Sequence, residues 1–351
     1  MDNRITKKRL SDFLSYEWIL MIVIAVVAIV VWELAYTIGG VRLTVGQEFK
    51  YYYDQSVVAV NDYGILNKVG RNTFSYDVLK LDSEALTAEF NVLSVRLSIQ
   101  EGDILFTDSV GIDETDPDKK KTVNIRAQNN VDSYGMYSLD ELHADSVNYL
   151  KANFLKNDYS TATDLSSFVG VEQEDGTVSY AQYIDGAKLE TTFRQRMKGD
   201  NRFRKEDQIQ QGIQLETARI NKLIDETKFF GNFLKNSSAD TFFTYTKYEQ
   251  SLRFAENQNN QNLVEQYKNQ IEAEKQAGRE NAKYGINLGA FEGRADCESP
   301  SNYFRVSGSG EDTAKNVVMM AFNFRSFQPH LQFETISFMN TIIRAFTVPN
   351  A

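Results

Sequence analysis

Hydrophobic positions along the chain fall into a few long or periodic stretches, and each stretch predicts an element. The most continuous one, residues 18–32 (WILMIVIAVVAIVVW), contains no charged residue, glycine, proline or amide. Extended to Ile38 it covers 21 residues, which as a helix would measure about 31 Å, close to the hydrocarbon thickness of a bilayer. Trp18 and Trp32, the only tryptophans of the chain, are spaced as expected of rings near the two membrane interfaces. The pattern predicts a transmembrane helix over residues 18–38.

Charged residues on either side of this segment predict its orientation. Four basic residues precede it, whereas only Arg42 and Lys50 follow it closely. By the positive-inside rule, we expect residues 1–17 in the cytoplasm and residues 39–351 outside the cell. A retained signal anchor is favoured over a cleaved signal peptide because no small-x-small cleavage site follows the apolar run. A lipoprotein anchor is excluded, since the only cysteine is Cys297.

Beyond the segment, strand and helix patterns alternate, which predicts a mixed α/β domain. Residues 41–60 are rich in β-branched and aromatic residues and are expected to supply one or two strands. Short apolar runs predict buried strands at residues 104–106 and 316–324. Apolar residues at helical spacing predict helices over residues 138–157 and 333–346.

Residues 84–99 fit two patterns, because one set of their apolar residues has helical spacing and an overlapping set alternates as in a strand. A helix is favoured, since Asp82 and Ser83 can cap its first turn. A hairpin that turns at residues 101–103 is the alternative.

From residue 188 to residue 283 the pattern changes to long, mostly polar helices with a narrow apolar stripe. The spacing of this stripe drifts and keeps no strict heptad, which favours an antiparallel two-helix projection over a free coiled coil. Its turn is expected near residues 236–238. The expected architecture is therefore an α/β extracytoplasmic domain with a long helical insertion at residues 188–283, behind one N-terminal transmembrane helix.

Composition and charge exclude several classes of function. The chain has 351 residues and a formal net charge of −10, which does not suit nucleic acid as a partner. One cysteine and two histidines leave no thiolate zinc site or histidine metal cluster, so no metal or other cofactor is expected. No phosphate-binding loop, zinc-protease motif or serine-hydrolase motif is present. We therefore expect a protein without enzymatic activity, with an ectoenzyme as the least favoured class.

Two charged clusters are interpreted as ordinary solvated surface. Asp113, Asp116 and Asp118 invite comparison with a calcium loop, but they lack its glycine and terminal glutamate, and three lysines follow them. The basic residues within 194–205 alternate with acidic ones, as on a salt-bridged helix surface.

Two passages resemble a known class of protein. Residues 92–108 (VLSVRLSIQEGDILFTD) are similar to the helix–Gly-Asp–strand step near the start of extracytoplasmic solute-binding proteins, and the second passage lies within residues 316–343. The whole chain resembles uncharacterised single-pass membrane proteins of Gram-positive bacteria, some of them encoded near sugar ABC transporters. The resemblance implies an extracytoplasmic solute-binding-like domain whose partners are the membrane and an ABC-type transporter or another membrane protein. The absence of tryptophan after Trp32 disfavours stacking on sugar rings.

The expected function is that of a membrane-tethered, non-enzymatic solute-binding-like or transporter-accessory protein. The alternative is a structural or assembly protein whose helical projection docks a partner protein. A small-molecule site would need a cleft with a few convergent polar and aromatic groups. We expect it near the ends of the two predicted strands, where Asp108, Tyr134 and Tyr303 are candidates to line it. No catalytic residue and no metal ligand is predicted.

Overall fold

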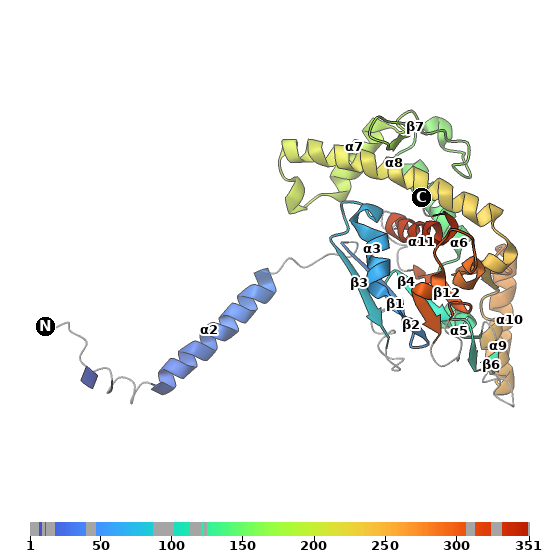
Figure 1. The fold of residues 1–351 in the computed structure, drawn as a ribbon, viewed down its shortest axis with the longest axis horizontal. Helices are drawn as coiled ribbons and strands as arrows, with labels where there is room; N and C mark the ends of the chain where they lie inside the picture. The colour runs from blue at the N-terminus through green and yellow to red at the C-terminus, as the bar shows by residue number, and fades with distance from the viewer. Residues whose placement is uncertain are drawn as a thin grey trace. The chain divides into compact units, whose positions relative to one another are not determined.

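The fold is taken from a computed structural model of the chain (Figure 1). It describes residues 7–8, 11, 18–39, 47–86, 102–112, 121–122, 125–306, 313–323 and 332–349. The chain forms two compact units, Met1–Thr44 and Val45–Ala351. Each unit is described by itself.

The first unit contains α2 (Trp18–Gly39), a helix of 22 residues. Its side chains are described over residues 22–32, and all of these are exposed. Among the described residues, no helix meets both the length and the hydropathy needed to cross a membrane. The membrane anchor expected at residues 18–38 thus stays a prediction.

The second unit is built around a six-stranded sheet with the order β3-β1-β4-β12-β10-β9. β3, β1 and β4 are parallel, β12 is antiparallel to both of its neighbours, and β9 is antiparallel to β10. The mixed α/β class expected from the sequence is therefore confirmed for this unit. The bounds are β1 Glu48–Tyr53, β3 Lys80–Ala85, β4 Ile104–Asp108, β9 Phe242–Tyr245, β10 Ala282–Asn287 and β12 Val317–Ala321.

The two central strands are the continuous apolar runs of the sequence. Every residue of β4 and of β12 is buried, because both faces of the sheet are covered. A strand that alternated apolar and polar residues would bury its polar groups here, which is why both strands are continuous apolar runs. The strands expected at residues 104–106 and 316–324 are therefore confirmed. The range 41–60 supplies β1 and the short β2 (Val57–Ala59), which pairs with β11 (Phe304–Val306).

Helices cover both faces of the sheet. Ile65 and Val69 of α3 (Asp62–Thr73) pack with Phe106 on one face, together with residues of α6 (Leu139–Asn153), α8 (Glu206–Asn236) and α11 (Gln332–Thr347). α5 (Ile125–Tyr134) packs through Ala127 and Val131 against Leu105 on the opposite face. α6 and α11 confirm the two helices expected at residues 138–157 and 333–346.

A third hydrophobic cluster joins α6 to α8 and to α7 (Gly186–Arg196), beside the β7–β8 hairpin. In Figure 1, α8 lies along α6 and α11. The remaining elements are the helices α9 Glu249–Asn257 and α10 Gln261–Gln276, the strand pairs β5 Gly111–Ile112 with β6 Lys121–Thr122 and β7 Val171–Glu172 with β8 Val178–Ser179, and the 3-10 turns η1 Asn157–Tyr159, η2 Asn201–Phe203, η3 Ala239–Thr241, η4 Leu288–Phe291 and η5 Pro300–Asn302.

The structure corrects the expectation of an all-helical projection at residues 188–283. α8 does end at Asn236, where a turn was expected, but the chain then enters β9, an edge strand of the main sheet. α8 also buries Ile220, Leu223 and Ile224. The range belongs to the same α/β unit because its apolar stripe packs on α6 and α11.

A second correction concerns Asp82 and Ser83, which were expected to cap a helix. Both residues lie within β3, paired in parallel with Lys50 and Tyr51 of β1. Pairing with a buried strand outweighs the local preference of these polar residues for a helix cap. Residues 87–99 of the ambiguous range, and the aspartates at 113, 116 and 118, lie outside the described residues.

Candidate functional site

The carboxyl ends of β1 and β4 form a topological switch point. These strands are parallel neighbours, and the helix that follows β1, α3, covers one face of the sheet. The first helix described after β4, α5, covers the other face. Chain segments that leave adjacent parallel strands toward opposite faces leave a crevice between them, where α/β proteins bind their ligands. This edge is therefore the candidate site.

A chain of polar contacts crosses the edge from α5 to the end of β1. Asp54 directly follows β1, and its Oδ2 accepts a hydrogen bond of 2.9 Å from the hydroxyl of Thr107 in β4. Thr107 in turn accepts a hydrogen bond of 3.2 Å from the amide of Asn130. Thr107 and Asn130 are buried, so these bonds fix the orientation of the half-buried Asp54 carboxylate.

Arg126, the second residue of α5, brings a guanidinium to the same carboxylate. Its Nη1 lies 3.4 Å from Oδ1 of Asp54, and its side chain is 30% exposed. Its Nε is buried and has no hydrogen-bond partner among the described residues. Since a guanidinium carries five N–H donors, Arg126 can donate to a carboxylate, phosphate or hydroxyl oxygen of a bound solute while keeping its contact with Asp54.

Asp108, a candidate from the sequence, is the last residue of β4 and is buried. Its backbone N–H donates to the hydroxyl of Ser56 at 3.3 Å, and its carboxylate accepts from the N–H of Val110 at 2.9 Å. Asp108 therefore shapes the loop that leaves β4 at this edge.

Tyr134, the second candidate, is the last residue of α5 and is half-buried. Burial, together with the negative charge of Asp54, raises the pKa of its hydroxyl to about 12. The phenol therefore stays protonated at neutral pH, and can both donate and accept a hydrogen bond.

Tyr303, the third candidate, lies in different surroundings. Its hydroxyl donates to the carboxylate of Glu298, and Nζ of Lys68 in α3 lies 5.8 Å from its ring centroid. Its ring lies 5.9 Å from that of Phe346 in α11. The structure thus brings Asp108 and Tyr134 to one edge and places Tyr303 in the packing around α3 and α11. A binding role for each of the three stays a prediction.

Sequence reasoning missed Asp54 and Arg126. Asp54 could have been found, because it follows the aromatic strand KYYY just as Asp108 follows ILFT. Arg126 carries no such signal, since its place at the edge depends on which face α5 covers.

The first turn of α3 could attract an anion, but the chain fills this position itself. Both Tyr51 and Tyr53 donate their hydroxyls to Oδ1 of Asp62, at 2.9 and 2.6 Å, and Ser83 donates to Oδ2 at 2.7 Å. Burial and the charge of Asp62 raise the pKa of Tyr51. The side chain of Asn61 caps the terminus by accepting from the N–H of Gly64 at 2.8 Å, and Asp62 adds a negative charge to the first turn, so the chain supplies both without a ligand.

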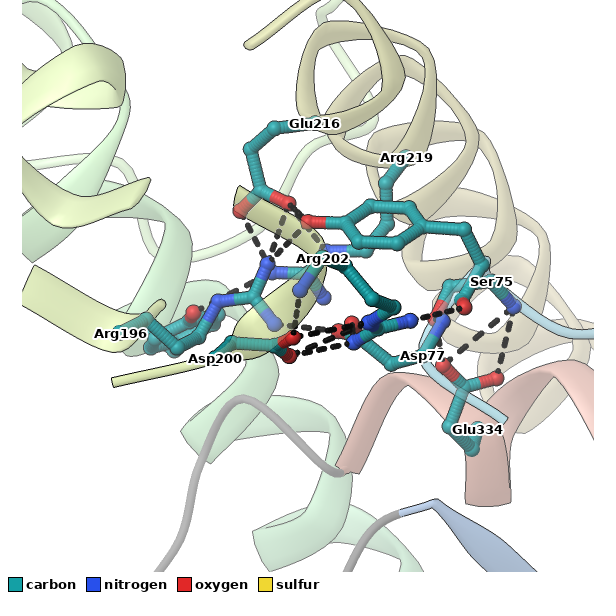
Figure 2. A network of polar contacts seen from close by, with 10 residues as sticks. Ser75, Asp77, Arg196, Asp200, Arg202, Glu216, Arg219 and Glu334 are labelled. Carbon is teal, nitrogen blue, oxygen red and sulfur yellow. Dashed lines mark hydrogen bonds and ion pairs between the residues drawn. The ribbon is translucent and has the colours of Figure 1, made fainter. Parts of the chain in front are cut away.

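A second polar cluster, the buried ion network, lies where the loop between α3 and β3 meets α7, α8 and α11 (Figure 2). Glu216 of α8 is fully buried and accepts from Nε and Nη2 of Arg219, at 2.9 and 3.0 Å. It also accepts from Arg196 of α7 at 2.5 Å and from the hydroxyl of Tyr76 at 2.8 Å. Although burial alone would raise it, the pKa of Glu216 is held at about 2 by these guanidinium groups.

The buried ion network extends to Asp77, which pairs with Arg196, and to Arg202, which pairs with Asp200 (Figure 2). At its other side Glu334, near the start of α11, accepts hydrogen bonds from the backbone N–H and the hydroxyl of Ser75. The paired charges tie the α3–β3 loop to the helices, which is a structural role.

Metal binding has no support in the described part of the chain, where no three His, Cys, Asp or Glu side chains could hold an ion together. Comparison of the chain with protein-family models, with curated proteins and with solved structures finds no match.

Proposed function

We propose that the chain is a membrane-tethered, non-enzymatic protein that binds a small polar solute outside the cytoplasm, as an accessory of a transporter or another membrane protein. The observation that carries the binding proposal is Arg126. At the switch point, beside a fixed carboxylate, its guanidinium keeps N–H donors that no described residue uses. Part of the Arg126 side chain is exposed, so a solute oxygen can accept a hydrogen bond from the guanidinium while the contact with Asp54 is kept.

Binding is favoured over catalysis by the chemistry at this edge. Hydrogen bonds link Asn130 to Thr107 and Thr107 to Asp54. They hold the Asp54 carboxylate in a fixed orientation, which suits recognition of a solute. His143, a side chain that could transfer protons, lies instead on α6 against Gly231 of α8. The aspartates at the edge alone do not define an acid–base pair.

The binding proposal is tested by a thermal-unfolding screen of the full chain in neutral detergent against amino acids, peptides, sugars and organic acids. A ligand present at 100 times its Kd should stabilise the protein by about 2.7 kcal/mol. In Arg126→Gln the affinity should fall by about tenfold or more, since a charge-assisted hydrogen bond is lost.

Arg253→Gln is the matched control, because Arg253 is an exposed arginine on α9. It should bind like the wild type. A ligand whose affinity is unchanged in Arg126→Gln would place the site elsewhere, and silence across the whole screen would contradict solute binding.

The membrane tether is proposed from residues 18–38. Their apolar run is uncharged up to Trp32, and a helix over these 21 residues would be about 31 Å long, close to the thickness of the hydrocarbon core. The basic residues before it favour a cytoplasmic N-terminus.

Protease treatment of intact cells tests this topology. An epitope tag at the C-terminus should be digested and a tag at the N-terminus should be protected, because only the former would lie outside the cell. Permeabilised cells, in which both tags should be digested, are the control. Protection of the C-terminal tag in intact cells would refute the proposed orientation.

The alternative function, a docking protein with a free helical projection, has less support. α8, the longest helix within residues 188–283, is buried along one side by α6 and α11, so it does not project freely toward a partner. A membrane partner that co-purifies while every solute fails to bind would nevertheless favour this alternative.

A further inference from the structure

A groove of about 500 Å³ lies on the helical face of the second unit, away from the candidate site. α3, α8 and α11 form its walls, and α11 packs against both of the other helices. Its lining includes Lys68 and Thr73 of α3, Lys222 and Glu226 of α8, and Arg344 of α11.

The charges of this lining are predominantly positive on a chain that is acidic overall. Lys68, Lys222 and Arg344 face a single lining carboxylate, that of Glu226, while the whole chain has a formal net charge of −10. Lys68 is also paired outside the lining, with Glu298 at 2.6 Å. Arg344 is paired as well, with Glu226 of the lining at 2.9 Å, so its guanidinium and the ammonium group of Lys222 would act as hydrogen-bond donors to an anion.

Arg344 is held in place while most of its donors stay available. Its Nη1 lies 2.9 Å from both carboxylate oxygens of Glu226, which is buried and also accepts from Asn340 at 2.6 Å. The guanidinium stacks on the ring of Phe229, with Cζ 4.1 Å from the ring centroid. No hydrogen bond of Nε or Nη2 occurs within the described residues. Such a preorganised guanidinium loses little side-chain entropy when it binds an oxyanion.

Lys222 completes the cationic wall. Its Nζ donates to the carbonyl oxygen of Thr73 at 2.7 Å, at the end of α3, which fixes the ammonium group beside the groove. Burial lowers the pKa of this lysine, so a nearby anion would stabilise its charged form.

The wall formed by α3 is interrupted at Gly70, which also lines the groove. Its φ of 42° and ψ of 166° are not helical, and a Cβ built on it would meet no atom within 4 Å. A side chain at this φ would be strained, so a glycine suits this break in the helix.

From the fixed guanidinium, the half-buried lysine and the groove that both side chains line, we infer that this groove binds a small oxyanion of the phosphate class. A phosphate offers several acceptor oxygens to the guanidinium of Arg344 and to the ammonium group of Lys222, which both line the groove. The inference concerns a second site and does not depend on solute binding at the switch point.

Isothermal titration calorimetry of the full chain in neutral detergent tests the inference with two probes. Inorganic phosphate represents a free anion, and glycerophosphoglycerol represents the headgroup of an anionic lipid. In Lys222→Gln and in Arg344→Gln, the affinity for whichever probe binds should fall by about tenfold or more. Lys222→Gln leaves the Arg344–Glu226 pair intact, and far-UV circular dichroism verifies the fold of both variants.

Lys268→Gln is the control, because Lys268 is an exposed lysine on α10, and it should bind like the wild type. Binding of phosphate that both variants weaken supports a free anion as the ligand. Tighter binding of glycerophosphoglycerol with the same dependence on the variants supports a lipid headgroup. Absence of binding by both probes, or binding that neither variant weakens, would overturn the inference.

Discussion

Replacing Glu216 with alanine is expected to lower the free energy of unfolding by about 3–5 kcal/mol, because it leaves buried cations without their central carboxylate. Arg219 is 3% exposed, and both it and Arg196 donate to Glu216. Since the only tryptophans, Trp18 and Trp32, lie outside the α/β unit, urea unfolding should be followed by far-UV circular dichroism.

Glu206→Ala is a matched control on the same helix. Glu206 also pairs with an arginine, Arg194 of α7, at 2.6 Å, but the two side chains are 64% and 38% exposed. An exposed pair contributes at most about 1 kcal/mol, so this variant should be nearly as stable as the wild type. Equal losses in Glu216→Ala and Glu206→Ala would show that burial of the ion network has no special effect.

Glu334→Gln is expected to change how stability depends on pH. Glu334 is buried, and this burial raises the pKa of its carboxyl group from 4.5 to about 7, against the lowering effect of Ser75 and Arg219. Below pH 4.5 the group is protonated in both the folded and the unfolded chain. Between pH 4.5 and 7 only the folded chain keeps the proton, so stability falls as the pH rises through this window, by about 3 kcal/mol in total.

Glutamine has no ionisable group, so Glu334→Gln removes the loss of stability that Glu334 causes between pH 4.5 and 7. The variant should therefore gain stability relative to the wild type as the pH rises, with the difference growing between pH 4.5 and 7 and constant above that. Urea unfolding at a series of pH values measures it. His143 acts in the opposite direction, because burial lowers its pKa, so only the difference between variant and wild type isolates Glu334.

Glu174→Gln, at an exposed position in the turn between β7 and β8, is the control and should follow the pH profile of the wild type. A difference between Glu334→Gln and wild type that does not vary with pH would refute the elevated pKa.

The central elements could be predicted from the sequence. A buried strand appears as a continuous apolar run and a core-facing helix as an apolar stripe, and neither pattern depends on which element packs against it. β4, β12, α6 and α11 all carry such runs or stripes. β3 and β9 do not. β3 (KLDSEA) is polar and becomes a strand by pairing with β1, and β9 (FFTY) is a short strand next to long helices whose periodicity hides it.

The residues of the candidate site also fall into a group that the sequence predicts and a group that it does not. Asp108 and Tyr134 were predicted near the end of a strand that the sequence identifies, and both lie at the edge of β4 and β1. Arg126 meets Asp54 across 72 positions of the chain, and this meeting depends on the strand order and on the face that α5 covers. The local pattern of apolar and polar residues specifies neither the strand order nor the face that α5 covers, because both result from the packing of the whole sheet.

The place of β12 in the sheet has a consequence for the order in which the chain can fold. β12 lies between β4 and β10, and its pairs with β4 join residues more than 200 positions apart. Such distant contacts carry a large loop-closure entropy and slow the folding of a domain. A chain that emerges from the ribosome N-terminus first has β4 long before β12, so this edge of β4 stays unpaired by β12 while the residues between the two strands are made. Open strand edges promote aggregation, so we expect the nascent chain to need cover for this edge until β12 emerges.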